Sequence, residues 1–207
     1  MSIHTFRFFA LVWAVLLVVG CKKDENTNTT TVLEVKTFSN LYAPQTGGQG
    51  QPVGGAFTRF SFAQNAIVTN DSWDIAFRGT TILVNGGANI GITDEPTRTG
   101  QAALSIVSNT LEAVKAYPAA STFKQDGANT YALPIGSGNG WYAYDAQTNL
   151  INPIAGKVFV VKTHDGKYAK FEILSYYKDA PTAPTAQSET RYFTFRFAYQ
   201  SNSSTTF

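Results

Sequence analysis

Two stretches of the chain alternate between apolar and polar residues with a period of two, which is typical of half-buried β-strands. In residues 73–77 (WDIAF), the side chains of Trp73, Ile75 and Phe77 are expected on one face of a strand. Residues 191–199 (RYFTFRFAY) place four aromatic side chains on one face in the same way. Such alternation predicts antiparallel strands with one face turned to a core.

A β-hairpin is predicted around a short turn near the C-terminal third of the chain. The apolar runs 157–163 (KVFVVKT) and 167–177 (KYAKFEILSYY) flank His164, Asp165 and Gly166. Glycine allows the positive φ that a tight turn between two strands requires. A further apolar run at 81–84 ends at an Asn-Gly-Gly turn signal, which predicts another strand.

One short helix is predicted at residues 110–117. Asn109 can cap its N-terminus, and Pro118 ends it. Its buried stripe would consist of Leu111, Val114 and Tyr117.

The remaining segments are read as loops. The glycine-rich residues 45–55 and 136–140 lack an alternating pattern, and Asp94 and Glu95 before Pro96 predict a solvated turn. The whole pattern predicts an all-β fold: a single antiparallel β-sandwich or open-barrel-like domain with one or two short helices.

The N-terminus has the features of a bacterial lipoprotein signal. Residues 1–20 carry Arg7 and the apolar run 8–19, which is shorter than a membrane span and has the length of a secretory signal. Val-Val-Gly precedes Cys21, so this cysteine is the predicted lipidation site. The polar residues 21–31 predict a flexible tether, and residues 32–207 the folded domain. The prediction is a lipid anchor in the outer membrane, exposed at the cell surface.

The composition narrows the chemistry. The chain has 16 Lys and Arg against 14 Asp and Glu and no basic run, so no nucleic-acid partner is expected. Of two His, one Met and one Cys, only His164 and Cys21 remain after removal of the predicted signal peptide. Structural zinc and Cys/His catalysis need more such groups. The protein is therefore predicted not to be an enzyme and to bind no nucleotide and no free metal ion.

Four segments match one known family in sequence, order and spacing: residues 72–87 (SWDIAFRGTTILVNGG), 134–145 (PIGSGNGWYAYD), 153–181 (PIAGKVFVVKTHDGKYAKFEILSYYKDAP) and 192–200 (YFTFRFAYQ). Together they resemble the HmuY-like family of haem-binding lipoproteins of Bacteroidota. The resemblance implies an all-β fold, haem as a bound cofactor, and an outer-membrane haem receptor as a partner. It also implies that the iron is held from both faces by His or Met side chains. This chain departs from that pattern, because His164 alone is available.

The loop before residue 145 is the most site-like part of the sequence. Its glycines let a flat ligand approach the backbone, and Asn139, Trp141, Tyr142 and Tyr144 offer stacking surface and polar groups. A tyrosinate can ligate haem iron, so Tyr142 or Tyr144 is a candidate metal ligand. The alternative is that these aromatic residues close one end of the sandwich.

Two further residues have both a functional and a structural interpretation. His164 is a candidate single ligand of haem iron, or an exposed residue of a turn. Arg78 could receive a haem propionate, or it could be a surface or strand-end arginine. The sequence thus predicts a surface lipoprotein that binds haem. The alternative is the same fold binding another tetrapyrrole, a glycan or a partner protein.

Overall fold

The computed structural model describes Met1, residues 33–202, Ser204 and residues 206–207. From Leu33 onward these residues form one compact unit. The predicted signal peptide, Cys21 and the tether lie outside the described residues. Within the described part of the chain, no helix is long and apolar enough to cross a membrane.

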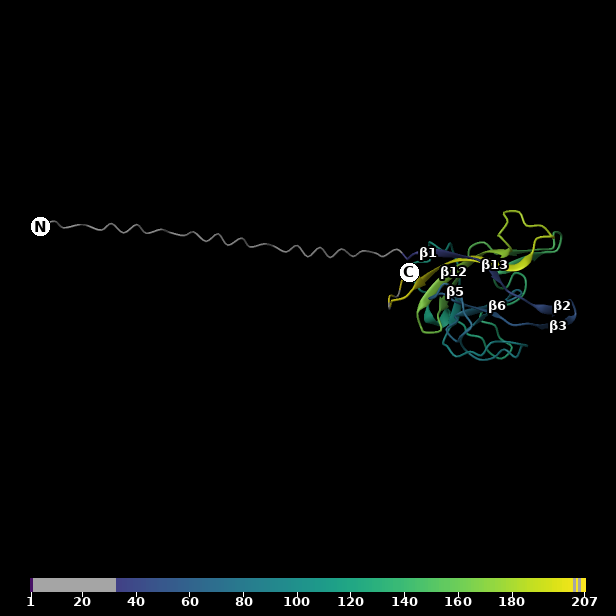
Figure 1. The fold of residues 1–207 in the computed structure, drawn as a ribbon, viewed down its shortest axis with the longest axis horizontal. Helices are drawn as coiled ribbons and strands as arrows, with labels where there is room; N and C mark the ends of the chain where they lie inside the picture. Colours follow the sequence, from purple (N-terminus) through teal and green to yellow (C-terminus); the bar gives the residue numbers. More distant parts are fainter. Residues whose placement is uncertain (2–32, 203, 205) are drawn as a thin grey trace. The chain divides into compact units, whose positions relative to one another are not determined.

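A five-stranded antiparallel sheet forms one layer of the domain (Figure 1). Its strands follow the order β1-β13-β12-β11-β8, so the long C-terminal strand lies beside the first strand. The strands are β1 (Val35–Tyr42), β8 (Ala103–Ser108), β11 (Lys157–Lys162), β12 (Tyr168–Tyr177) and β13 (Thr190–Gln200).

A four-stranded antiparallel sheet, of order β5-β4-β6-β7, forms the second layer. Its strands are β4 (Thr58–Ser61), β5 (Ala66–Ile67), β6 (Ile75–Arg78) and β7 (Thr81–Val84). Two small hairpins complete the fold: β2 (Thr46–Gly48) with β3 (Gln51–Gly54), and β9 (Tyr142–Asp145) with β10 (Leu150–Pro153). The only helix among the described residues is the 3₁₀ turn η1 (Ala120–Thr122).

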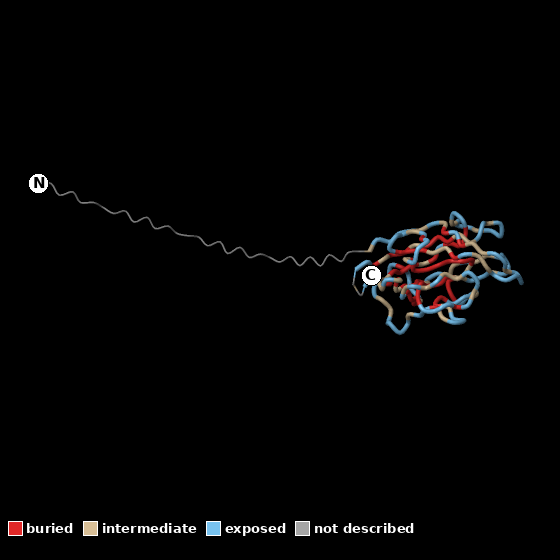
Figure 2. The backbone as a smooth tube through the Cα atoms, turned by 60° about the horizontal axis from the view of Figure 1, so that its bottom comes forward, coloured by how far each residue is buried: buried red, intermediate tan, exposed pale blue. Residues whose placement is uncertain are grey.

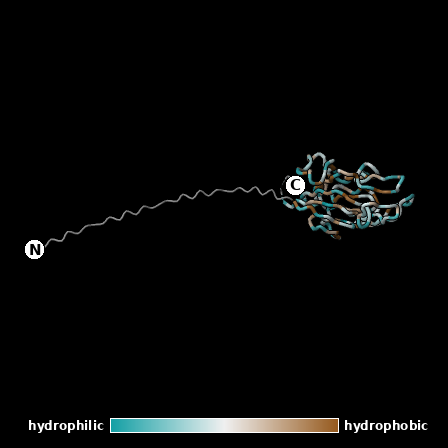
Figure 3. Tube along the Cα trace, turned by 90° about the horizontal axis from the view of Figure 1, so that it is seen from above, coloured by the Kyte–Doolittle hydropathy of each residue, from teal (hydrophilic) through white to brown (hydrophobic). Residues whose placement is uncertain are grey.

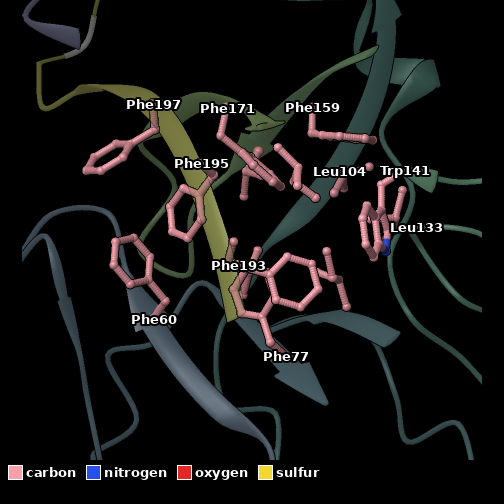
Figure 4. Close-up of a cluster of buried hydrophobic side chains, with 14 of the residues drawn as sticks. Phe60, Phe77, Leu104, Leu133, Trp141, Phe159, Phe171, Phe193, Phe195 and Phe197 are labelled. Carbon is pink, nitrogen blue, oxygen red and sulfur yellow. The ribbon is translucent and has the colours of Figure 1, made fainter. Parts of the chain in front are cut away.

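The two sheets meet through aromatic side chains (Figure 4). Ring centroids of Phe60 and Phe195 lie 5.1 Å apart, and those of Phe77 and Phe193 lie 4.8 Å apart. Each pair joins one strand of the four-stranded sheet to β13. Aromatic pairs at such spacings contribute about 0.5–1.5 kcal/mol beyond their burial. The fold is therefore an antiparallel β-sandwich, and the predicted fold class is confirmed.

Buried residues lie along the strands at the centre of the domain, and exposed residues lie mainly in the connecting loops (Figure 2). Hydrophobic residues follow the same central strands (Figure 3). In β13, Phe193, Phe195 and Phe197 belong to the core and Tyr199 packs against it, as the alternation predicts. The predicted hairpin around His164, Asp165 and Gly166 is confirmed, because β11 and β12 are paired neighbours.

The outer face of the five-stranded sheet carries a smaller apolar cluster. Val158 and Val160 of β11 point to this face and pack with Leu111 and Val114 from the connection after β8. Tyr117 stacks on Tyr168 with ring centroids 3.9 Å apart. The C-terminal Phe207 also belongs to this cluster. Residues of the connection and the C-terminus therefore cover part, not all, of this face.

The helix predicted at residues 110–117 is wrong. The segment makes a single turn, in which Val114 N donates to Thr110 O, and Ala116 then pairs with Thr206 as a β-bridge. The carbonyls that a longer helix would use are taken from outside: Lys115 O accepts from Phe207 N, and Val114 O from Lys170 Nζ. An eight-residue helix has little stability of its own, so these tertiary bonds prevail.

Two other expectations are corrected. Trp73 does not share a face with Ile75 and Phe77: it packs with Ala76 and Leu83 in a separate cluster, because the strand begins only at Ile75. The glycine-rich residues 45–55 are not a plain loop, since they contain the β2–β3 hairpin. A Cβ at Gly47 would lie 1.9 Å from Pro52 O, so only glycine allows this close pairing.

Candidate functional site

The loop 136–141 closes one end of the sandwich with a tryptophan. Trp141 is only 2% exposed, and its indole Nε1 donates to Thr80 O over 2.8 Å. Its ring packs against those of Phe193 and Tyr176, at centroid distances of 5.0 and 5.5 Å. A ring placed in this way has no free face for stacking. For Trp141 the structure therefore favours the closing role over ligand contact.

The other candidate residues of this segment lie in or beside the β9–β10 hairpin. Tyr144 is 47% exposed, and its phenol donates to Asn149 Oδ1 over 2.7 Å. Tyr142 is half-buried against the core, and the amide of Asn139 donates to Ile135 O. The structure thus gathers Asn139, Trp141 and both tyrosines in one segment. The side chains of Asn139 and Tyr144 are held by partners within that segment.

Arg78 ends β6 as predicted, yet it is buried and not at the surface. Its guanidinium donates to Gly55 O and Thr93 O and lies 4.2 Å from the centroid of the Phe57 ring. Burial lowers the pKa of the Arg78 guanidinium below its ordinary value. These contacts brace two loops around the arginine, which leaves it poorly placed to receive a carboxylate from solvent.

His164 is joined to a buried carboxylate of the opposite sheet. Its ring Nδ1 lies 2.8 Å from Asp74 Oδ1, and its backbone N–H donates to the same oxygen over 2.9 Å. The other oxygen of Asp74 accepts from the backbone N–H of Phe62 over 2.8 Å. Burial raises the pKa of the Asp74 carboxyl despite these hydrogen bonds. Nothing in the sequence joins these two residues, which are 90 positions apart.

The His164 turn and the Tyr142–Tyr144 segment lie at opposite ends of β6. Asp74 precedes the first residue of this strand, whereas Thr80, the partner of Trp141, follows its end. A strand rises by about 3.3 Å per residue, so the four residues of β6 separate these ends by roughly 13 Å. The hairpin also lies at the far end of β12 from the His164 turn, because the Tyr177 hydroxyl accepts from the N–H of Ile151, the strand partner of Tyr144. The imidazole and the phenols of the hairpin are therefore too far apart to ligate one iron from its two faces.

Hydrogen bonds within the fold occupy two further acidic side chains of predicted turns, those of Glu95 and Asp165. Glu95 is not solvated as predicted: it pairs with Arg98 at 2.8 Å and accepts from the N–H groups of Ile90 and Gly91. Asp165 accepts from the Thr163 hydroxyl over 2.7 Å. The described residues contain no group of three or more His, Cys, Asp or Glu that could hold a metal ion.

These observations define an antiparallel β-sandwich in which buried polar groups brace loops. The family model described as HmuY protein matches residues 55–197, and the chain belongs to this family. The resemblance noted in the sequence is thereby confirmed. No curated protein matches the chain.

Three solved structures are similar to the chain at low identity. A candidate lipoprotein from Bacteroides fragilis NCTC 9343 shares 14% identity over 70% of this chain and 85% of its own, with a TM-score of 0.44. A candidate HmuY-like haem-binding protein from Bacteroides vulgatus ATCC 8482 shares 14% over 69% and 84%, with a TM-score of 0.41. The apo HmuY analogue of Tannerella forsythia shares 13% over 83% and 97%, with a TM-score of 0.40. At these scores the family assignment rests on the family model.

Proposed function

We propose that this protein is a lipid-anchored haem-binding protein of an outer membrane that holds iron through a single imidazole, that of His164. Membership of the HmuY family supports haem as the ligand. The observation that carries the choice of residue is the 2.8 Å contact between His164 Nδ1 and the buried Asp74 carboxylate. Binding, not catalysis, is the proposed activity.

A carboxylate behind a histidine is the usual arrangement of a metal-ligating imidazole. When Nδ1–H donates to Asp74, the lone pair of the ring lies on Nε2, and the carboxylate makes that nitrogen a stronger ligand. The side chain of His164 is 23% exposed, so it is neither sealed in the core nor free in solvent. The backbone bond to Asp74 fixes the turn that carries the ring. Together these contacts hold the imidazole ready to bind.

The small number of side chains that could ligate iron determines which visible spectrum we expect from bound haem. After the predicted signal is removed, the chain has no methionine and no second histidine. Tyr142 and Tyr144 lie at the far end of β6, so they do not offer a second ligand to iron held by His164. We therefore expect ferric haem to be high-spin, either five-coordinate with an empty open face or six-coordinate with water on that face.

The test is a titration of the purified protein with ferric haem, followed by visible spectroscopy. Wild type should give a high-spin spectrum that is lost in His164→Ala and kept in Tyr144→Phe and Tyr142→Phe. A low-spin, six-coordinate spectrum would contradict the single-ligand proposal. Loss of the spectrum in either tyrosine variant would move the ligand to the β9–β10 hairpin. Absence of any spectral change in wild type would reject haem and favour another tetrapyrrole, a glycan or a partner protein.

The anchor and the receptor belong to the same proposal. Lipidation of Cys21 would tether the domain to the outer membrane through the polar residues 21–31. Cys21→Ser should release the protein from the membrane fraction of producing cells. Protease treatment of intact cells should cleave the wild-type protein, and a fully protected protein would contradict surface exposure. An outer-membrane haem receptor is the proposed partner, to be sought by cross-linking on whole cells.

A further inference from the structure

The outer face of the five-stranded sheet has an uncovered end that forms an open hollow of about 430 Å³. Small-molecule sites commonly enclose about 300–1,000 Å³, so the space suits a compact ligand. The hollow lies where the ends of β8, β11 and β12 meet the segment around η1. Its lining includes Gln101, Ala103, Phe123, Gln125, Lys162 and Tyr168.

Two aromatic rings form a corner of this hollow. The rings of Phe123 and Tyr168 have centroids 5.9 Å apart and an interplanar angle of 72°. Tyr117 stacks on Tyr168 and supports it from the covered part of the face. A flat ring placed in such a corner can stack on one side chain and meet the edge of the other, which is the geometry that aromatic pairs favour.

A lysine supplies the charge at the edge of the hollow. Lys162 has neither an ion-pair partner nor a hydrogen bond among the described residues, whereas Lys36 and Lys178 pair with glutamates. A Cβ built at Gly166 would lie 3.9 Å from Lys162 Cε, so the stem of the lysine runs over the turn after β11. The acidic groups that follow Lys162 and Gln125 in the sequence have other partners. Asp165 bonds to Thr163, and Asp126 pairs with Arg98.

Side-chain amides complete the polar part. Gln125 Nε2 already donates to the carbonyls of Gln101 and Ala102, which holds it against the end of β8. The side-chain amide of Gln101 has no hydrogen bond to the described residues. The lining therefore offers one ammonium, one amide donor and two rings, and no carboxylate.

We infer that this hollow binds a flat, ring-bearing carboxylate, with the ring between Phe123 and Tyr168 and the carboxylate on Lys162. The inference goes beyond the proposed function, because it requires no iron and does not involve His164. Lys162 shares the outer face of β11 with Val158 and Val160, whereas the imidazole turns to Asp74 in the opposite sheet. The carboxylate could come from a small aromatic acid or from the propionate edge of a tetrapyrrole.

Two pairs of iron-free probes separate these sources. The first is 2-naphthoate with its methyl ester, and the second is protoporphyrin IX with its dimethyl ester; each ester keeps the rings and removes the charge. Binding is followed by probe fluorescence, and the contact surface by amide chemical shifts of Ala103, Phe123 and Tyr168. The acid of at least one pair should bind about fivefold more tightly than its ester, as expected for a partly exposed ion pair.

The lysine variants provide the decisive comparison. Lys162→Gln should weaken binding of the acid about fivefold and leave the ester unchanged, which removes the difference within the pair. Lys157→Gln, at the other end of the same strand and outside the hollow, should leave both affinities unchanged. If Lys162→Gln removes the acid–ester difference in affinity for 2-naphthoate, the ligand is a small aromatic acid. If it does so for protoporphyrin IX alone, the ligand is a tetrapyrrole. The inference is overturned if neither acid binds, or if Lys162→Gln binds the acid as wild type does.

Discussion

The two faces of the five-stranded sheet are built from the same strands and behave differently. On the inner face, Phe159, Phe171 and Phe195 are fully buried against the second sheet, and no charged side chain interrupts them. In β11, Val158 and Val160 lie on either side of Phe159 in the sequence and point to the outer face. Lys162 follows on the same face at the end of the strand. Among the described residues, a connection and the C-terminus cover part of this face, and they leave the hollow beside Lys162 open.

Because of this difference, we expect the inner face to determine the stability of the fold and the open end of the outer face to bind ligand. The inner face buries large rings in a closed layer, where any polar group would have to be desolvated. The outer face has room for polar groups because it is only partly covered: Ser105 bonds to Thr122, and Lys170 donates to Val114 O. Substitutions on the inner face should therefore change the free energy of unfolding, and those at the open end of the outer face should change ligand affinity.

The largest effect is expected at the centre of the inner face. Phe195→Ala removes a fully buried ring that contacts Phe38, Phe60 and Phe77 and should lower the free energy of unfolding by about 3–5 kcal/mol. Urea denaturation followed by near-UV circular dichroism measures this loss. The matched control is Tyr42→Ala, an exposed ring that stacks on Tyr192 and should cost under about 1 kcal/mol. Equal losses would contradict the role assigned to the inner layer.

A smaller effect is expected where a polar link joins the two sheets. In Asp74→Asn one carboxylate oxygen becomes an N–H donor, which must face the N–H of Phe62 or the N–H groups of His164. The variant should lose about 2 kcal/mol of unfolding free energy, measured by urea titration at neutral pH. Asp145→Asn is the control, because Asp145 also accepts hydrogen bonds through both of its carboxylate oxygens but is only partly buried. If both variants lost the same amount, burial of Asp74 would not be the cause.

The covered part of the outer face should respond to pH. Burial lowers the pKa of Lys170 below the ordinary 10.5. Between the folded and unfolded pKa values the unfolded chain binds more protons, so this lysine makes the fold more stable as pH rises toward 10.5. At pH 7 the free energy of unfolding of Lys170→Met should differ from that of wild type by no more than about 1 kcal/mol. The variant loses the bond to Val114 O, but it also avoids the cost of burying an ammonium group, and these two effects partly cancel. Thermal unfolding at pH 7 and pH 10 should show wild type gaining on the variant, and a constant difference would refute the assignment.

The smallest effect on stability is expected at the hollow itself. Lys162→Gln removes a charge without a partner among the described residues, so the free energy of unfolding should change by under about 0.5 kcal/mol. Thermal unfolding without ligand measures this. A loss above about 1 kcal/mol would show that Lys162 supports the fold and that its effect on ligand affinity is indirect.

Long alternating or apolar runs made much of the sandwich predictable. The run at 81–84 coincides with β7, and the predicted strands at 157–163, 167–177 and 191–199 agree with β11, β12 and β13 to within one residue at each end. These strands carry their own pattern because one face meets the core. Strands such as β4 (TRFS) and β9 (YAYD) are four residues long, and their pairing partners define them more than their sequence does.

The candidate site was less predictable, because its contacts join distant parts of the chain. Asp74 accepts from the backbone N–H groups of Phe62 and His164, which are far apart in the sequence. Its bond to the imidazole depends on how two sheets meet, which local pattern does not encode. The same holds for Lys170 and Phe207, whose bonds replace the predicted helix. Trp141 was recognised as a notable residue, but only packing could decide between ligand contact and closure.

The Asp74 carboxylate has a mechanical consequence. Asp74, directly before β6, binds the turn after β11 through Oδ1 and the end of β4 through Oδ2. One carboxylate thus links the ends of three strands. If His164 ligates haem iron as proposed, the metal withdraws electrons from the imidazole, which strengthens the hydrogen bond to Asp74 and changes the one from Phe62 to the same carboxylate. Haem binding should therefore change the exchange rate of the Phe62 amide proton on the side of the opposite sheet.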